Sequence, residues 1–214
     1  MLRLVVLISG SGSNLQAIID NCESNNIDAK VVGVISNNSK AFGLKRAKKH
    51  KIPAVVIDNK DYKSRKDFDE KLLYEINSFM PDLVVLAGFM RILTPLITLA
   101  FKGMMINIHP SLLPKYPGMN THQKVIDNKD HEHGVSIHLV SEELDAGPII
   151  AQAKILVNYN QTIDVLIARI HRAEHILFPK IIGMIASQVI DIKKPLLNFL
   201  YNFAFNIKSL IRFY

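Results

Sequence analysis

Short apolar runs alternate with amphipathic stretches along the first two thirds of the chain. Residues 2–8 are apolar except for Arg3, as in a parallel strand that is covered on both faces. Residues 65–79 repeat apolar positions at helical spacing. Further strands are predicted at 30–35, 54–57, 83–87 and 104–109, and further helices at 14–21 and 41–50. Strands that alternate with helices imply right-handed crossovers and a parallel sheet.

The pattern changes after Gly134. Two apolar runs, 135–140 and 149–157, flank a polar loop that contains Gly-Pro, which indicates an antiparallel strand pair. Residues 162–187 then predict a long helix, which Pro179 would interrupt. The expected fold class is therefore α/β: a Rossmann-like, mostly parallel sheet flanked by helices, with a C-terminal antiparallel strand pair and a long helix.

The C-terminal tail differs from the rest. We expect a single domain over residues 1–190 and an atypical apolar, basic tail over 191–214. From residue 193 onward the tail has four cations and no acid. If the tail were helical, its apolar side chains would cover most faces of the helix, and only a narrow polar stripe would remain at Asn198, Asn202 and Asn206. Packing on the domain, or self-association as in a homodimer, is favoured over contact with a membrane surface.

Composition narrows the function classes. Apolar residues make up 49% and charged residues 21%, which excludes disorder as the main state. The net charge is +7; removing the four tail cations leaves 7 − 4 = +3, so no nucleic-acid partner is expected. The single cysteine, Cys22, excludes an intramolecular disulfide. No window has the roughly 20 apolar residues of a membrane span. We expect a cytoplasmic protein without stable membrane insertion.

The turn after the first strand, residues 9–14, reads SGSGSN. Its glycines allow close approach of an anion, and free amides at the next helix start can bind phosphate. A dinucleotide-binding G-x-G-x-x-G motif would need glycine where Leu15 stands, and a Walker A lysine is absent. The turn therefore predicts a phosphate site for a mononucleotide-like ligand. The alternative is a Gly/Ser turn capped by Asn14.

Candidate acid–base chemistry lies in residues 107–114, NIHPSLLP. Asn107 and His109 alternate along a strand, so both side chains share one face at its carboxyl end. An amide beside an imidazole can stabilise an oxyanion and move a proton. Asp145 could hold the imidazole in orientation. The alternatives are a histidine bonded to backbone and an aspartate that caps its own turn.

Three further histidines, His131, His133 and His138, raise the question of zinc. His131 and His133 fall in a charged stretch that is read as a loop, and no cysteine supports them. No metal is expected.

The separated motifs together resemble the phosphoribosylglycinamide formyltransferase family, from residue 2 to about residue 190. The motifs are LISGSGSNLQAIID, AFGLKRA, SRKDFD, PDLVVLAGFMRIL, NIHPSLLPKYPG, HGVSIHLV, LDAGPII and AEHILFP. The resemblance implies formyl transfer from 10-formyltetrahydrofolate, as co-substrate, to the amine of glycinamide ribonucleotide in purine biosynthesis. It implies direct attack without an acyl-enzyme or a metal.

Site residues follow from the same resemblance. It implies catalytic roles for Asn107, His109 and Asp145. It implies phosphate binding by Gly12, Ser13 and Asn14, and further contacts to the ribonucleotide by His171 and Glu174. The implied folate contacts are Arg65, Met90, Arg91, Ile92, Leu93, Asn107, Ser141, Glu142, Glu143, Leu144 and Asp145.

Two features depart from the family pattern. His171 stands where many members carry glutamine, and the apolar tail does not resemble the more polar family C-terminus. Competing functions stay open. Methionyl-tRNA formyltransferase would need a further C-terminal domain, and formyltetrahydrofolate hydrolase usually has an extra N-terminal one. A nucleotide-binding module without catalysis could keep the same fold.

Overall fold

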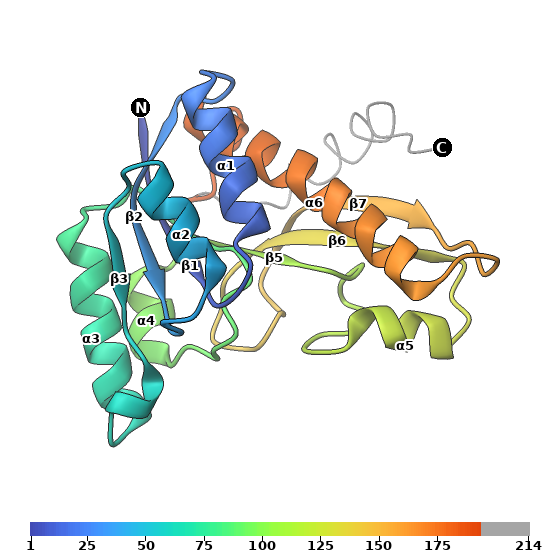
Figure 1. Cartoon of the computed structure of the whole chain (residues 1–214), viewed down its shortest axis with the longest axis horizontal. Helices are drawn as coiled ribbons and strands as arrows, with labels where there is room; N and C mark the ends of the chain where they lie inside the picture. Colours follow the sequence, from blue (N-terminus) through green and yellow to red (C-terminus); the bar gives the residue numbers. More distant parts are fainter. Residues whose placement is uncertain (194–214) are drawn as a thin grey trace.

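The computed structural model describes residues 1–193 and forms one seven-stranded sheet in the order β3-β2-β1-β4-β5-β6-β7 (Figure 1). Strands β1 to β5 are parallel, and β6 and β7 run antiparallel at one edge. The strands are β1 (Leu2–Ile8), β2 (Ala29–Ser36), β3 (Ala54–Val56), β4 (Leu83–Leu86), β5 (Met105–His109), β6 (Glu132–Leu139) and β7 (Ile149–Leu156). The predicted fold class is confirmed.

Helices cover both faces of this sheet (Figure 1). They are α1 (Ser13–Glu23), α2 (Phe42–Lys49), α3 (Arg65–Ser78), α4 (Pro95–Ala100), α5 (Thr121–Asp127) and α6 (Ile163–Ala186), with a short 3₁₀ helix, η1, at Asn59–Asp61. Local signals set some boundaries. The Ser64 hydroxyl, for example, accepts a hydrogen bond of 3.1 Å from the Asp67 N–H and caps α3.

The position of β1 in the middle of the sheet explains why nearly all of its residues are apolar. Leu4, Val6 and Ile8 face one core, which α1 and α6 cover. Val5 and Leu7 face a second core, which includes apolar residues of α3 and α4. All of these side chains are fully buried. A central strand with both faces covered therefore needs apolar residues at alternate and intervening positions alike.

The structure corrects one prediction for the last helix. Pro179 lies inside α6, and the helix continues beyond it to Ala186. A proline in a helix interior costs about 3 kcal/mol because it removes a hydrogen bond and crowds the preceding turn. Here Leu177, Phe178 and Ile181 are fully buried beside it, and their packing offsets that cost.

The short helices α4 and α5 were not predicted. Each spans fewer than two and a half turns, too short for an apolar repeat to stand out from the loops around it. The predictions for the tail fall on residues 194–214, which lie outside the described part of the chain. Within residues 1–193, none of the helices combines the length and the apolar character needed to cross a membrane.

Candidate active site

Asn107, His109 and Asp145 meet at the carboxyl end of β5. Asp145 comes from the loop between β6 and β7. Its Oδ2 lies 3.4 Å from His109 Nδ1, and its Oδ1 accepts a hydrogen bond of 3.3 Å from the Asn107 amide. The imidazole and the carboxylate are each more than nine-tenths buried. The tertiary structure thus brings together three residues whose proximity the sequence leaves open.

The His109 ring has an acceptor at each nitrogen. Nε2 lies 2.8 Å from the Tyr116 carbonyl oxygen, and Nδ1 faces the Asp145 carboxylate. Neither partner can donate a hydrogen bond. A substrate oxygen would have to replace the Tyr116 carbonyl to reach Nε2.

Asp145 is held as a carboxylate. Burial by itself raises the pKa of this group. A hydrogen bond of 2.8 Å from the Gly118 backbone N–H and the charge of His109 are among the interactions that outweigh burial. The pKa of Asp145 is therefore lowered, and the side chain is a carboxylate beside His109 Nδ1.

His138, which the sequence raised only as a zinc candidate, is a member of this cluster, and its place beside Asn107 was missed. It lies directly opposite Asn107 in the antiparallel pairing of β5 with β6. The Asn107 amide donates to His138 Nε2 at 3.0 Å, and His138 Nδ1 donates to the Leu139 carbonyl at 2.8 Å. The signal that could have found it is this cross-strand register, which follows only if β5 and β6 are recognised as neighbours.

The predicted phosphate cradle lies between β1 and α1. Gly12, the N-cap of α1, has a left-handed backbone (φ +67°) and no side-chain cap. A Cβ on Gly12 would lie 2.6 Å from the Gly43 Cα, so glycine lets the two backbones approach. The uncapped amides of α1 remain free to bind an anion.

The cradle opens into a cavity of about 360 Å³. Its lining includes the residues that the resemblance implies for the ribonucleotide: Gly12, Ser13, Asn14, His171 and Glu174. The Asn14 amide donates to Glu174 at 3.0 Å, and both side chains are buried. Burial raises the pKa of Glu174, although the bond from Asn14 and the nearby His171 act in the opposite direction. Within the described residues, the buried Asn14 Oδ1 has no hydrogen-bond partner, which leaves an acceptor for a ligand.

A second, narrower cavity of about 80 Å³ lies on the other side of β5. It collects most of the residues that the resemblance implies for folate: Arg91, Ile92, Leu93, Asn107, Ser141, Glu142, Glu143, Leu144 and Asp145. His138 also lines it. The Arg91 guanidinium lies over the Phe68 ring at 5.3 Å, and its buried Nε has no hydrogen-bond partner among residues 1–193.

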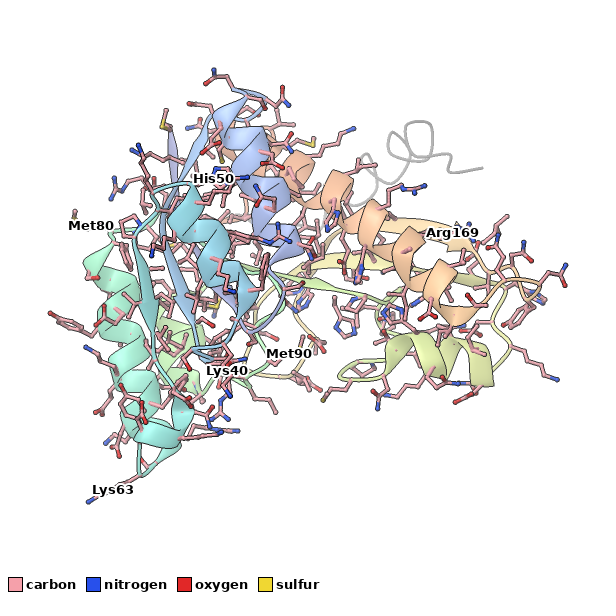
Figure 2. The ribbon with its side chains drawn as sticks, viewed as in Figure 1. Lys40, His50, Lys63, Met80, Met90 and Arg169 are labelled. Carbon is pink, nitrogen blue, oxygen red and sulfur yellow. The ribbon has the colours of Figure 1, made fainter. Side chains whose placement is uncertain are left out.

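Met90 and Arg65 lie elsewhere. Met90, labelled in Figure 2, lines the cradle cavity rather than the narrow one. The residue is 68% exposed. Its backbone N–H donates to the Ser9 hydroxyl at 2.7 Å, which joins the loops after β4 and β1. Arg65 begins α3, is exposed and lines neither cavity.

The histidines that raised the question of zinc include His133, which pairs with His122. His133 belongs to β6 and is buried, so its assignment to a loop was wrong. It contacts His122 at 2.9 Å. Burial and the neighbouring His122 lower the pKa of His133 to about 4. No group of three or more potential ligand residues is found over residues 1–193.

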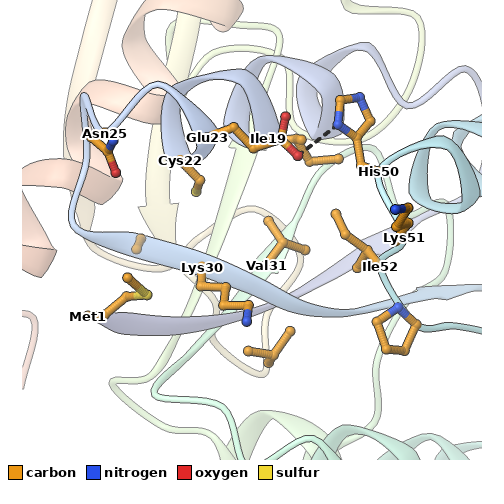
Figure 3. A pocket seen from close by; sticks show the side chains of 13 residues that line it. Met1, Ile19, Cys22, Glu23, Asn25, Lys30, Val31, His50, Lys51 and Ile52 are labelled. Atoms are coloured by element: carbon orange, nitrogen blue, oxygen red, sulfur yellow. Dashed lines mark hydrogen bonds and ion pairs between the residues drawn. The ribbon is translucent and has the colours of Figure 1, made fainter.

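Another cavity, of about 540 Å³, lies at the amino ends of β1 and β2 (Figure 3). Cys22, Lys30 and Ile52 are among its lining residues. Its acid, Glu23, is paired with His50 at 2.9 Å. None of the predicted site residues lines this cavity.

Two cavities thus lie beside β5, and the Asn-His-Asp cluster is at the end of that strand, so the fold has room for two ligands next to one polar cluster. Residues 2–182 match the formyl transferase family, and the chain belongs to that family. The resemblance in the sequence is thereby confirmed.

The similarity extends to individual proteins. The chain is 48% identical to phosphoribosylglycinamide formyltransferase of Escherichia coli over 186 residues, which cover 87% of this chain and 88% of that protein. The solved structure of phosphoribosylglycinamide formyltransferase from Coxiella burnetii has a TM-score of 0.84 at 45% identity, covering 87% of this chain and 88% of that one. Glycinamide ribonucleotide transformylase 1 from Symbiobacterium toebii has a TM-score of 0.85 at 39% identity, with 88% and 89% coverage.

Proposed function

We propose that this chain transfers a formyl group from 10-formyltetrahydrofolate to the amine of glycinamide ribonucleotide, a step of purine biosynthesis. The observation that carries the proposal is the position of β5 between two cavities. Asn107 lines the narrow cavity, whereas Ile108 and Pro110 line the cradle cavity. A formyl donor in the first and a phosphorylated amine in the second would meet beside His109.

The chemistry follows from these positions. The neutral amine attacks the formyl carbon, and a C–N bond forms while negative charge collects on the formyl oxygen. The Asn107 amide and the His109 ring N–H donate hydrogen bonds to that oxygen. One amine proton moves to the folate nitrogen, and the bond from that nitrogen to the formyl carbon then breaks. His109 can carry the proton between the two nitrogens.

Asp145 supports this step through its charge. It faces His109 Nδ1 and accepts from Asn107, so it orients both donors. To reach the formyl oxygen, His109 Nε2 exchanges the Tyr116 carbonyl for it, and the Asn107 amide exchanges one of its present acceptors.

The two ligands are held by separate groups. Gly12, Ser13 and Asn14 bind the phosphate of the ribonucleotide at the start of α1, and Glu174 and His171 contact the rest of it. Arg91, Ile92 and Leu93 with residues 141–145 enclose the folate. Met90 and Arg65 remain assigned to folate on the resemblance alone. No metal takes part in this proposal.

The setting of the reaction is also part of the proposal. A single domain over residues 1–190 carries it out in the cytoplasm, with small molecules and no nucleic acid as partners. The lone cysteine fits a reducing compartment.

The test is absorbance-monitored release of the folate product from 10-formyl-5,8-dideazafolate, with and without glycinamide ribonucleotide. We expect release that requires the ribonucleotide, and a loss of about 100- to 1,000-fold in turnover for His109→Ala. Release without the ribonucleotide would identify a hydrolase. Ligand binding with no release would identify a nucleotide-binding module.

A further inference from the structure

A groove that the transfer chemistry does not use lies where the described chain ends. It has a volume of about 820 Å³ and lies among α4, the turn before β5 and the start of the β6–β7 loop. Its apolar lining consists of Leu99, Met104, Leu139, Val140, Pro148 and Ile192. Leu99 is 54% exposed. A large leucine exposed within a concave apolar surface is typical of a binding face.

The chain itself leads into this groove. Ile192 is buried in the main core, so the end of the described chain is anchored. A Cβ added to Gly103, in the turn before β5, would lie 3.6 Å from the Ile192 carbonyl oxygen and 3.9 Å from the Lys193 Cα. Residues 192 and 193 therefore pass directly over this turn and themselves line the groove.

The sequence that follows matches an apolar groove. Residues 195–207 contain no charged side chain. Their apolar residues are Leu196, Leu197, Phe199, Leu200, Tyr201, Phe203, Ala204, Phe205 and Ile207. Such a segment in water would expose a large apolar area, which burial against the domain would remove. The charged residues of the groove are Lys102, Glu142 and Lys193, a mixed set, so apolar contact rather than charge would hold the segment.

We propose that residues 195–207 of the same chain occupy this groove. The segment begins two residues after Lys193, and so short a tether gives a high effective concentration at the groove. A second copy would first have to associate, with its additional loss of translational freedom. The intramolecular contact is therefore favoured over exchange of tails between chains.

Occupancy of the groove would also affect the narrow cavity that is proposed to bind folate. Val140, Ser141 and Glu142 line both this groove and the narrow cavity beside Asn107. A tail packed against them restricts the start of the loop that carries Asp145. We infer that the tail acts as a positioning element for this loop, an inference that rests on the proposed function, whereas the docking itself does not.

Hydrogen exchange measured by mass spectrometry on the full-length chain tests the docking. The tail variant carries both Leu197→Asp and Leu200→Asp, and the groove variant carries Leu99→Asp. Each variant places negative charge in the proposed contact between the tail and the groove. Leu156→Asp is the matched control, because Leu156 is 69% exposed on β7 and lies outside the groove. We expect hydrogen exchange in peptides covering 98–104 and 139–144 to become about tenfold faster in both test variants, because each loses roughly the burial of one leucine. Exchange in the same peptides should stay unchanged in the control. Unchanged exchange in both test variants would overturn the proposal.

Cross-linking identifies the occupant. In a Cys22→Ser background, Leu99→Cys is combined with Leu197→Cys, Leu200→Cys or Phe203→Cys, and the products are separated by mass under non-reducing conditions. At least one pair should link within a single chain at every protein concentration. Links formed only between two chains would assign the groove to a second copy. If peptides 98–104 and 139–144 were protected from hydrogen exchange only when anionic phospholipid vesicles are added, the tail would be assigned to a membrane surface. Either result overturns the proposal.

The effect on the loop is measured separately. Leu99→Asp should raise the KM for the formyl donor by roughly threefold or more, with kcat and the KM for the ribonucleotide little changed. Faster exchange with an unchanged KM would retain the docking and reject the positioning role. If formyl transfer itself were absent, the exchange and cross-linking results would still decide whether the tail docks.

Discussion

The Asp145 carboxylate lies 3.4 Å from His109 Nδ1, although the two residues come from the loop after β6 and the end of β5. The same carboxylate accepts from the Asn107 amide at 3.3 Å and from the Gly118 backbone at 2.8 Å. One buried charge therefore orients both groups proposed to stabilise the formyl oxygen. Removing that charge should affect the reaction more than the binding of either substrate.

Asp145→Asn tests this directly. The amide keeps the size of the side chain but removes the negative charge that faces His109 Nδ1. We expect kcat to fall by about 100-fold or more, with the KM values for both substrates within a few-fold of wild type. Steady-state kinetics with each substrate varied in turn measures the split. Full activity in this variant would contradict the assigned role of Asp145.

His138 is predicted to act by positioning Asn107. Replacing it by alanine removes the acceptor 3.0 Å from the Asn107 amide and leaves a small buried space. We expect His138→Ala to lower kcat by about tenfold, the effect of one lost hydrogen bond of about 1.4 kcal/mol. His138→Gln, whose side-chain oxygen can accept from the same amide, should recover most of the loss. Equal damage from both substitutions would indicate a packing role only.

Gly12 and Gly10 form a matched pair for the phosphate cradle. Gly12 has φ +67°, and a Cβ there would lie 2.6 Å from the Gly43 backbone. Gly12→Ala should lower the melting temperature by several degrees, since left-handed strain of roughly 1–2 kcal/mol adds to the clash. It should also raise the KM for the ribonucleotide. A Cβ on Gly10 meets nothing within 4 Å, so Gly10→Ala should keep the wild-type melting temperature. Similar melting temperatures for the two variants would count against this account.

The buried His122–His133 pair predicts a loss of stability in acid. The pKa of His133 is lowered to about 4 in the folded protein, below the value of about 6.5 in an unfolded chain. The unfolded state therefore binds a proton more readily. This contribution is fully present above pH 6.5 and is lost as the pH falls toward 4, by roughly 3 kcal/mol in all.

Urea unfolding between pH 4 and pH 7 measures this effect. His133→Gln removes the titration and should flatten the fall in the free energy of unfolding over that range. His131→Gln, at an exposed neighbouring position, is the control and should follow the wild-type curve. A His133→Gln variant as pH-sensitive as the wild type would mean that other groups dominate.

Much of the scaffold follows from local sequence. The continuous apolar run of β1, the helical repeat and Ser64 cap of α3, and the glycine turn before α1 depend on residues close together in the chain. Alternation along β5 also placed Asn107 and His109 on one face before any fold was known. Such features can be predicted because their energies come from backbone conformation and from burial of a repeating face.

Other features were decided by tertiary structure. Asp145 reaches His109 only because β6 pairs antiparallel with β5, and the same register sets His138 opposite Asn107. Met90 lines the cradle, while its neighbour Arg91 lines the narrow cavity. Pro179 remains helical because the core around it is closely packed. Local sequence was thus enough to predict most strands and the longer helices, together with the chemistry they carry, but not α4, α5 or the start of β6. Which side chains meet was determined by strand register and loop closure, whose energies depend on contacts between distant parts of the chain.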